Sequence, residues 1–353
     1  MTDDLRTYVQ GHAGRITFAR PKALNALNHP MCLTLERALD AWRDDAAVAL
    51  IVIDAQGERA FCAGGDIAAV YHAGITGDFT TGQQFWRDEY RMNAKIAAYP
   101  KPIIAFMQGF VMGGGVGVGA HASHRIIGAS TQMAMPESGI GLIPDVGGTY
   151  LLAHAPGHIG EYLGVTGARM TPADALYAGF ADRYLPEETW PQIIQALCDH
   201  GDLRDMPSGQ TPPNSSTLEA MRPQIDAIFS RPDLEQILTA LRAADSEFGH
   251  KTLSVVARNA ALSMQAAIQL IRIARAQNDI CQALSNEYRF TYRACELAEF
   301  LEGVRAQIID KDRTPHWQDT PDSLTSQRVQ ALLAPLPAQA GINFGAPAPN
   351  RAL

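Results

Sequence analysis

The stretch MGGGVGVG, from Met112 to Gly119, decides how the rest of the chain is organised. It follows the apolar run from Ile103 to Met107, whose β-branched residues are typical of a buried strand. The glycines from Gly113 to Gly115 let the backbone approach another group closely, because no Cβ intervenes. They also allow amide N–H groups to turn outward and form a concavity that binds anions. We therefore expect the N–H of Gly114 to face a site where negative charge develops on an oxygen.

Two further glycine-containing loops have related positions in the sequence. The loop from Ala63 to Asp66 comes after the continuous apolar run from Ala49 to Ile53 and opens into a helical pattern. Paired backbone N–H groups from two separate loops are the usual construction of an oxyanion hole in acyl-transfer chemistry. The alternative is that both glycine clusters are ordinary turns.

The third loop, from Met133 to Thr149, supplies two carboxylates, Glu137 and Asp145. The prolines and glycines of this loop make its backbone irregular, so the eight-residue spacing does not define a shared helical face. Both acids can nevertheless reach one cavity and perform acid–base chemistry. The simpler alternatives are that Asp145 caps the following helix and that Glu137 is a solvated loop carboxylate.

Strand and helix patterns alternate through the first half of the chain, which predicts a layered α/β core with right-handed crossovers. Helix starts are predicted at Asn28 and Thr171, where a capping residue is followed by proline in the first turn. Beyond residue 200 the pattern changes to successive amphipathic helices. We therefore divide the chain into a catalytic core, residues 1–203, and a helical C-terminal region, residues 204–353. The alanine- and proline-rich end of that region, from Ala334, is predicted to be a poorly ordered tail.

The composition is that of a globular protein of 353 residues with 46% hydrophobic and 19% charged residues. A formal net charge of −8 argues against general nucleic-acid binding. No apolar run approaches the length that spans a membrane. The acidic N-terminal sequence MTDDLR resembles neither a secretory signal nor a transit peptide, so a cytoplasmic location is expected.

The cysteines and histidines give no sign of a metal site. The five cysteines are scattered without a C-x-x-C pair, and Cys62 is expected to be a packed apolar residue. His121 and His124 lack a third ligand of suitable spacing, which favours a packing role. The run from Gly115 to Ala120 fits the dinucleotide fingerprint G-x-G-x-x-A, but Glu137 does not lie at a strand end, as that fold requires. We expect no metal and no separate cofactor.

Three segments together resemble the crotonase, or enoyl-CoA hydratase/isomerase, superfamily: ERAFCAGGDI at 58–67, KPIIAFMQGFVMGGGVGVG at 101–119 and MAMPESGIGLIPDVGGT at 133–149. Within it the chain is most similar to the 3-hydroxyisobutyryl-CoA hydrolases. That similarity includes 85–91 and extends into the C-terminal region at 287–289 and 302–317. The resemblance therefore covers nearly the whole chain.

The resemblance implies a spiral ββα core with a helical C-terminal region and a coenzyme A thioester as substrate. It assigns an oxyanion hole to the N–H groups of Gly65 and Gly114, and substrate contacts or catalysis to Glu89, Glu137 and Asp145. Further substrate contacts are implied at Ala26, Ala63 and Asp66. Coenzyme A is then part of the substrate, and the implied pathway is valine degradation. A homo-oligomer is also implied, because crotonase relatives commonly form trimers or hexamers, although the longer C-terminus could alter the assembly.

One departure from the hydratases is informative. They carry a catalytic glutamate three residues beyond the second oxyanion glycine, where this chain has Gly117. The resemblance therefore favours hydrolysis of a 3-hydroxyacyl-CoA over hydration. An enoyl-CoA isomerase or weak hydratase is the alternative, and a non-catalytic acyl-CoA-binding protein is the second alternative. The polyanionic substrate also requires a local basic patch, for which Arg20, Lys22 and Lys101 are the candidates.

Overall fold

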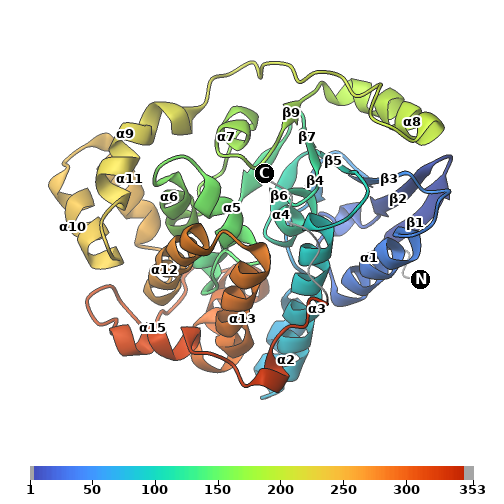
Figure 1. Ribbon diagram of the computed structural model, residues 1–353. Coiled ribbons are helices and arrows are strands. Elements are labelled where there is room, and N and C mark those ends of the chain that lie inside the picture. The colour runs from blue at the N-terminus through green and yellow to red at the C-terminus, as the bar shows by residue number, and fades with distance from the viewer. Residues whose placement is uncertain (1–3, 346–353) are drawn as a thin grey trace.

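The computed structural model describes residues 4–345, which contain two β-sheets, with the C-terminal helices on the side of the molecule away from β1 (Figure 1). The larger sheet has six strands in the order β1-β2-β3-β5-β7-β9. Its adjacent strands run parallel to one another, except for the antiparallel pair β1 and β2. The smaller sheet is parallel, in the order β4-β6-β8. The strands are β1 Leu5–Gln10, β2 Ala13–Phe18, β3 Leu50–Ala55, β4 Ala60–Cys62, β5 Ile103–Met107, β6 Phe110–Met112, β7 His124–Ile127, β8 Gln132–Ala134 and β9 Arg183–Tyr184.

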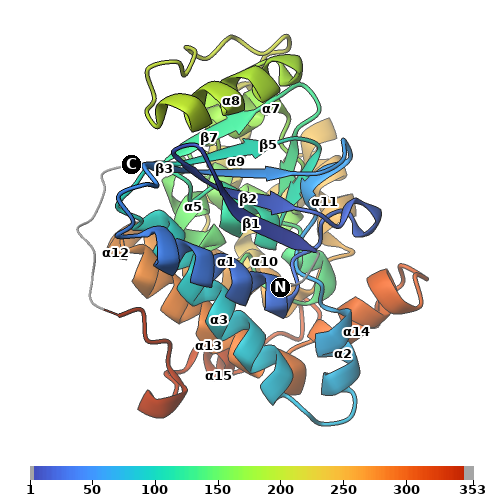
Figure 2. The same ribbon diagram turned by 90° about the vertical axis from the view of Figure 1, so that its right-hand side faces the viewer.

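The central strands are buried on both faces, which explains their continuous apolar sequences. Leu50 and Val52 of β3 belong to a cluster on one face, whereas Ile51 and Ile53 point into the main core on the other. Helix α8 (Trp190–His200) covers the first face, and α1 (His29–Trp42) and α3 (Thr80–Ala97) lie beyond the second (Figure 2). The predicted α/β layering is confirmed.

The smaller sheet brings the three glycine-containing loops together. Strand β4 ends at Cys62, β6 ends at Met112 and β8 ends at Ala134, each directly before one of these loops. Because parallel strands end at the same edge of a sheet, the loops converge although about 70 residues separate the first from the last. The glycine run itself forms the helix α4 (Gly114–Gly119). A Cβ at Gly115 would lie 2.1 Å from the carbonyl oxygen of Cys62, so the predicted close backbone approach is present.

Helices α1 and α7 begin at the capping residues that the sequence predicts. Asn28 accepts a hydrogen bond from the N–H of Met31, and Thr171 forms a reciprocal capping box with Asp174. The remaining helices are α2 Ala68–Gly74, α5 Gly148–His154, α6 Ile159–Thr166, α7 Pro172–Tyr177, α9 Thr217–Phe229, α10 Leu234–Ala243, α11 Glu247–Val256, α12 Ala261–Gln277, α13 Ile280–Leu297, α14 Phe300–Val304 and α15 Ser326–Leu333, with short turns η1 Pro21–Ala23, η2 Glu137–Ile140, η3 Glu187–Thr189, η4 Arg305–Ile309 and η5 Ala338–Ala340.

The C-terminal helices pack directly on the core. Helix α12 lies against α5 and α6, and α13 lies against α3, so that one continuous apolar cluster contains residues from both regions (Figure 1). The described part of the predicted tail packs Leu336, Ile342 and Phe344 against this cluster, and residues 346–353 lie outside the described part. Between residues 4 and 345, no helix is long and apolar enough to cross a membrane.

Candidate active site

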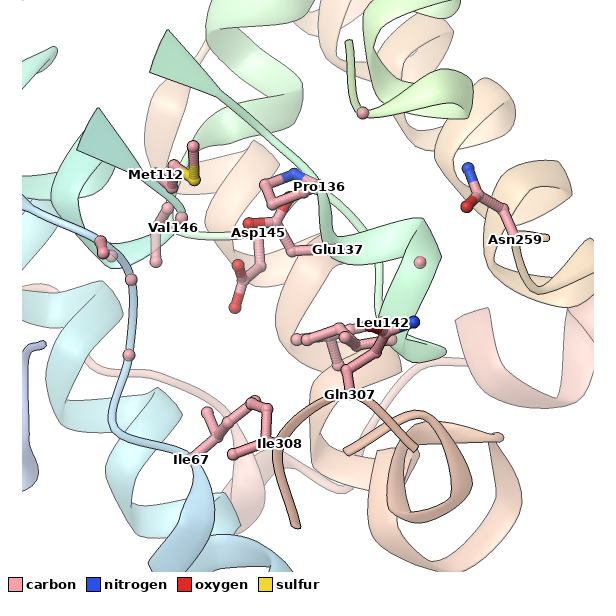
Figure 3. Close-up of a pocket in the computed structure, with 18 of the residues that line it drawn as sticks. Ile67, Met112, Pro136, Glu137, Leu142, Asp145, Val146, Asn259, Gln307 and Ile308 are labelled. Carbon is pink, nitrogen blue, oxygen red and sulfur yellow. The ribbon is translucent and has the colours of Figure 1, made fainter. Parts of the chain in front are cut away.

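A cavity of about 670 Å³ opens where the three loops meet. Its inner wall is formed by Ala63–Gly65, Gly113–Gly114 and the third loop, with Glu137 and Asp145 close together (Figure 3). Gln307 and Ile308 lie across the cavity from these acids (Figure 3). Six lining residues come from the C-terminal region: Val255, Arg258, Asn259, Gln307, Ile308 and Arg313. The site is therefore completed by helices beyond the predicted catalytic core.

The two glycines expected to form the oxyanion hole lie beside each other. A Cβ at Gly114 would lie 3.4 Å from the backbone nitrogen of Gly65. The preceding residues, Gly64 and Gly113, have φ angles of +123° and +48°, which side chains other than glycine rarely tolerate. The N–H groups of Gly65 and Gly114 donate to no protein acceptor in residues 4–345. They are therefore available to an oxygen atom in the cavity.

Two carboxyl groups border these glycines. Glu89 comes from α3 and Glu137 from the turn η2, and their exposed fractions are only 2% and 5%. The Oε1 atoms of Glu89 and Glu137 each lie 2.8 Å from the position that a Cβ would take, at Gly114 and Gly113 respectively. Glu89 Oε1 and Glu137 Oε2 have no hydrogen-bond partner in the described chain. Such unpaired buried oxygens are costly, which indicates a place for substrate.

Burial, and for the two glutamates also the charge of Asp145, raises the affinity of these carboxyl groups for protons. Burial raises the pKa values of Glu89 and Glu137 well above the ordinary glutamate value, and the nearby charge of Asp145 raises both further. Burial likewise raises the pKa of Asp145 to about 7, although the hydrogen bond from Tyr90 opposes this shift. Groups that titrate near neutral pH are suited to acid–base catalysis.

Asp145 is held on a strained turn by two buried side chains. The Tyr90 hydroxyl donates a hydrogen bond of 2.7 Å to Asp145 Oδ2. His121 Nε2 lies 2.8 Å from the carbonyl oxygen of Val146, whose φ of +54° is unusual for a β-branched residue. Burial lowers the pKa of His121 to about 4, so the ring is neutral and donates its Nε2 proton. The predicted packing role of His121 thus includes support of this turn.

Glu287, on helix α13, holds the other end of the same turn. Its fully buried carboxyl group accepts hydrogen bonds from the N–H of Gly147 at 2.8 Å and from the N–H of Thr149 at 3.0 Å. It also contacts the Thr149 hydroxyl. Burial raises the pKa of Glu287 to about 8, and these donors oppose the shift. The C-terminal region therefore fixes the loop that carries Asp145.

The structure separates some predicted site residues from the cavity. Ala63 lines it, whereas Ala26 and Asp66 do not. Instead, Nη1 of Arg20 bonds to the Ala26 carbonyl oxygen at 2.8 Å and to the Asp66 carboxylate at 3.1 Å. Arg20 is therefore already paired.

The other two candidates for the basic patch also lie away from the cavity walls. Lys101 Nζ donates to the carbonyl oxygen of Asp45 at 2.7 Å and to that of Trp42. Lys22 is exposed and does not line the cavity. The three cations predicted to bind phosphate thus do not form a patch on the described cavity wall.

The interior of α4 has no room for the glutamate of the hydratases. A Cβ at Gly117 would lie 2.7 Å from Val146 Cβ and 2.8 Å from Asn93 Nδ2. Cys62 is a buried thiol with a pKa raised to about 12, which is unsuited to nucleophilic attack. Among residues 4–345, no three His, Cys, Asp or Glu side chains are arranged to hold a metal ion.

Sequence reasoning missed the supporting residues and the C-terminal wall. Tyr90 and Glu287 belonged to stretches quoted for their resemblance, but no pattern indicated that they hold the Asp145 turn. Arg313 likewise belonged to a quoted stretch, whereas Arg258 and Asn259 carried no local signal; only tertiary packing brings these three residues to the cavity.

The chain is similar to known proteins over most of its length. Residues 13–333 match the family described as enoyl-CoA hydratase/isomerase. The 3-hydroxyisobutyryl-CoA hydrolase, mitochondrial, of Gallus gallus is 36% identical over 89% of this chain and 84% of its own. A crystal structure of an enoyl-CoA hydratase from Rhodobacter sphaeroides 2.4.1 is 49% identical, with a TM-score of 0.93 over 97% of this chain and 100% of its own. A carnitinyl-CoA dehydratase from Mycobacterium thermoresistibile is 37% identical, with a TM-score of 0.92 over 97% of this chain and 99% of its own.

The buried acids predict how stability depends on pH. Asp145 and Glu287 have folded-state pKa values of about 7 and about 8, whereas in the unfolded chain they titrate near pH 4 (about 3.9–4.3). Between these limits the folded state binds more protons, so the free energy of unfolding falls as the pH rises from about 4.5 to 8. Urea unfolding across this range measures the slope. Asp145→Asn should flatten it and the exposed Glu235→Gln should not; a wild-type slope of zero or opposite sign would contradict the prediction.

The hydrogen bonds of Glu287 predict a graded loss of stability. Glu287→Leu leaves two buried N–H groups and a hydroxyl without their acceptor, at a cost of roughly 1–3 kcal/mol for each unsatisfied group. Glu287→Gln keeps one acceptor oxygen and should lose less. Urea unfolding compares the two variants with Gln282→Ala, an exposed change on the same helix. Equal stability of the leucine and glutamine variants would exclude this supporting role.

Proposed function

The chain belongs to the enoyl-CoA hydratase/isomerase family, and from this we propose that the protein hydrolyses a 3-hydroxyacyl-CoA thioester of the 3-hydroxyisobutyryl type. The observation that carries the proposal is the pair of unpaired N–H groups, Gly65 and Gly114, bordered by Glu89 and Glu137 and facing a site without the second hydratase carboxylate. The name of the Gallus gallus relative supports the same activity. The products are free coenzyme A and the 3-hydroxy acid.

In the proposed mechanism the thioester carbonyl oxygen lies between the N–H groups of Gly65 and Gly114. As a nucleophile attacks the carbonyl carbon, these donors stabilise the negative charge that forms on the oxygen. The C–S bond then breaks, and the sulfur leaves as a thiolate that takes up a proton. Removing one such donor typically costs roughly 2.7–4 kcal/mol of barrier stabilisation.

Glu137 is the proposed catalytic carboxylate. It either takes a proton from the attacking water or attacks the carbonyl carbon itself, forming an anhydride that water then hydrolyses. Both routes start from the deprotonated group. Because burial and Asp145 raise the pKa of Glu137, the reactive fraction grows as the pH rises.

Asp145 and Glu89 are the proposed substrate-binding carboxyl groups. Asp145 Oδ2 is held by Tyr90, and the carboxyl group lines the cavity beside Glu137. In the proposal it accepts a hydrogen bond from the 3-hydroxyl group of the substrate. A substrate without this hydroxyl leaves a buried acceptor unpaired and is therefore disfavoured. The unpaired Oε1 of Glu89 lies beside Gly114, where the proposal places the thioester carbonyl group.

A second candidate is hydration, dehydration or isomerisation of an enoyl-CoA. The names of the Rhodobacter and Mycobacterium proteins, an enoyl-CoA hydratase and a carnitinyl-CoA dehydratase, support it, as does the pair of buried acids. The lack of space at Gly117 argues against it, because addition of water across a double bond in this family uses a carboxylate at that position. A non-catalytic acyl-CoA-binding role would not explain why Glu89, Glu137 and Asp145 are buried together with raised pKa values.

Location and assembly remain predictions. A cytoplasmic protein that forms homo-oligomers and acts in valine degradation is our proposal from the sequence. The Gallus gallus relative is named as mitochondrial. The mass of the purified protein by light scattering tests the assembly.

Glu137→Gln should reduce release of free thiol from 3-hydroxyisobutyryl-CoA by roughly 10²–10⁴-fold, because the amide neither takes up a proton nor attacks the carbonyl. A thiol reagent measures the rate, and Glu235→Gln serves as an exposed control. Turnover that is unchanged in Glu137→Gln would remove this residue from the chemistry. Wild-type protein that releases thiol from no 3-hydroxyacyl-CoA would overturn the proposed activity.

Gly117→Glu should not create a hydratase. The new side chain would collide with Val146 and Asn93, so we expect lower stability and no gain in hydration of crotonyl-CoA. Absorbance of the conjugated double bond follows hydration, and urea unfolding follows stability. If wild-type protein converts crotonyl-CoA or a 3-enoyl-CoA without releasing thiol, the second candidate function is favoured.

A further inference from the structure

Glu89 is a buried carboxyl group for which the proposed mechanism gives only a binding role. It projects from α3, lines the cavity and has an exposed fraction of 2%. Among residues 4–345, no hydrogen bond or ion pair reaches its side chain, and its Oε1 atom is itself buried. A carboxylate that is taken out of water without a partner is very unfavourable. Such a group is stable when it is protonated and when the substrate supplies its hydrogen-bond partner.

The Glu89 carboxyl group and the two oxyanion N–H groups surround one position beside Gly114. That position is the point where a Cβ attached to Gly114 would lie. Glu89 Oε1 is 2.8 Å from this point, and the backbone nitrogen of Gly65 is 3.4 Å from it. All three residues line the cavity, and Gly114 has no side chain to occupy the space between them. A substrate oxygen that accepts hydrogen bonds from both N–H groups thus comes within reach of Glu89 as well.

Glu137 borders a different part of the glycine loops. Its Oε1 atom lies 2.8 Å from the corresponding point at Gly113, where the next atom from outside the adjacent residues is the Cα of Gly64, at 3.7 Å. The backbone nitrogen of Gly65 is not among the atoms within 4 Å of that point. The two glutamates therefore have different neighbours. Glu89 lies beside the amides that would hold the carbonyl oxygen, which leaves Glu137 to act on the carbonyl carbon.

We propose that the carboxyl group of Glu89 donates a hydrogen bond to the thioester carbonyl oxygen, as a third donor beside the N–H groups of Gly65 and Gly114. This inference rests on the proposed function, because it concerns the same thioester. The negative charge that forms on the oxygen strengthens the hydrogen bond, so the donor stabilises the transition state more than it stabilises the bound substrate. The proton stays on Glu89 throughout the step.

The surroundings of Glu89 favour the neutral form that this role requires. The titratable groups of the described chain that interact with it are Asp145 and Glu137 from the third loop, Cys32 from α1 and Cys62 from β4. All of these are acids, and no lysine, arginine or histidine of residues 4–345 is among them. Burial and the charge of Asp145 raise the pKa of Glu89 well above the ordinary glutamate value. An ionised Glu89 would repel the developing oxyanion, whereas the neutral group donates to it.

The pH dependence of hydrolysis distinguishes a neutral donor from an ionised carboxylate. The reaction requires Glu137 to be ionised and Glu89 to be neutral. We therefore expect kcat to rise with pH and then to fall as Glu89 loses its proton, with two apparent pKa values that belong to the pair. Glu89→Gln supplies an N–H donor that does not ionise. It should keep kcat within about tenfold of wild type and lose the fall at high pH.

Glu89→Met has a similar size but no donor. It should lower kcat roughly 10²–10³-fold with KM nearly unchanged, because the lost hydrogen bond acts mainly in the transition state. Since Glu89 has no partner in the described chain, neither substitution leaves another buried polar group unsatisfied, and urea unfolding should show that both variants fold. The exposed Glu235→Gln is the control. A glutamine variant that is as slow as the methionine variant, or that keeps the fall at high pH, would overturn the proposed donor.

Infrared spectroscopy of the bound thioester separates this inference from the proposed activity. The probe is 3-hydroxyisobutyryl-CoA, isotope-labelled at its carbonyl carbon and bound to Glu137→Gln protein. Hydrogen-bond donors lower the stretching frequency of a carbonyl group, so the frequency should be lower with Glu89 or Glu89→Gln than with Glu89→Met. If wild-type protein hydrolyses no 3-hydroxyacyl-CoA but this difference is present, the proposed activity fails and the third donor stands. Equal frequencies would overturn the third donor even where hydrolysis is observed, and a probe that does not bind would contradict both.

Discussion

The hydrogen bonds between Glu287 and the turn after Asp145 are the interaction on which the site most depends. Asp145 lies in a buried group of acids where each charge opposes the next, and its backbone continues into residues with positive φ angles. Such a turn persists only where the surroundings hold it. Glu287 supplies acceptors for two of its N–H groups, and it comes from a helix about 140 residues further along the chain. The C-terminal helices thus help to hold the candidate active site in place.

Glycines allow the backbone at the start of helix α4 to approach the buried acids closely. At Gly113 and Gly114 the space that a Cβ would fill is bordered by carboxyl oxygens of Glu137 and Glu89, and at Gly117 it is bordered by the amide of Asn93. The helix α4 can approach these polar groups only because it lacks side chains there. This close approach places the N–H of Gly114 beside that of Gly65. One glycine run therefore provides the proposed oxyanion site and leaves no room for the carboxylate on which a hydratase relies.

Local signals in the sequence predicted the inner wall of the site. The strands predicted before the first two loops, 49–53 and 103–107, are β3 and β5 of the larger sheet, whereas the short strands β4, β6 and β8, whose parallel pairing brings the loops together, were not predicted. The glycines and acids of the loops were predicted because their signals are local. The caps at Asn28 and Thr171 were predicted for the same reason, since their hydrogen bonds span only a few residues. The sequence did not predict that helix α8 covers one face of the larger sheet or that Glu287 holds the turn after Asp145. It also did not predict that Arg258 and Arg313 line the cavity. Their positions depend on packing between distant segments, which leaves no periodic pattern in the sequence.

The distribution of charge explains how an acidic protein can accept a polyanionic substrate. Basic residues predicted from their nearness in sequence to the glycine loops, such as Arg20 and Lys101, form structural contacts instead. Ionised carboxylates in the cavity would repel phosphate, yet the same burial that makes Glu137 useful for acid–base chemistry keeps it protonated over more of the pH range. Burial of the acids therefore has opposite effects on the two steps: protonated Glu137 does not repel the substrate phosphates, whereas the proposed catalysis requires the deprotonated form, so the step that burial favours depends on the pH.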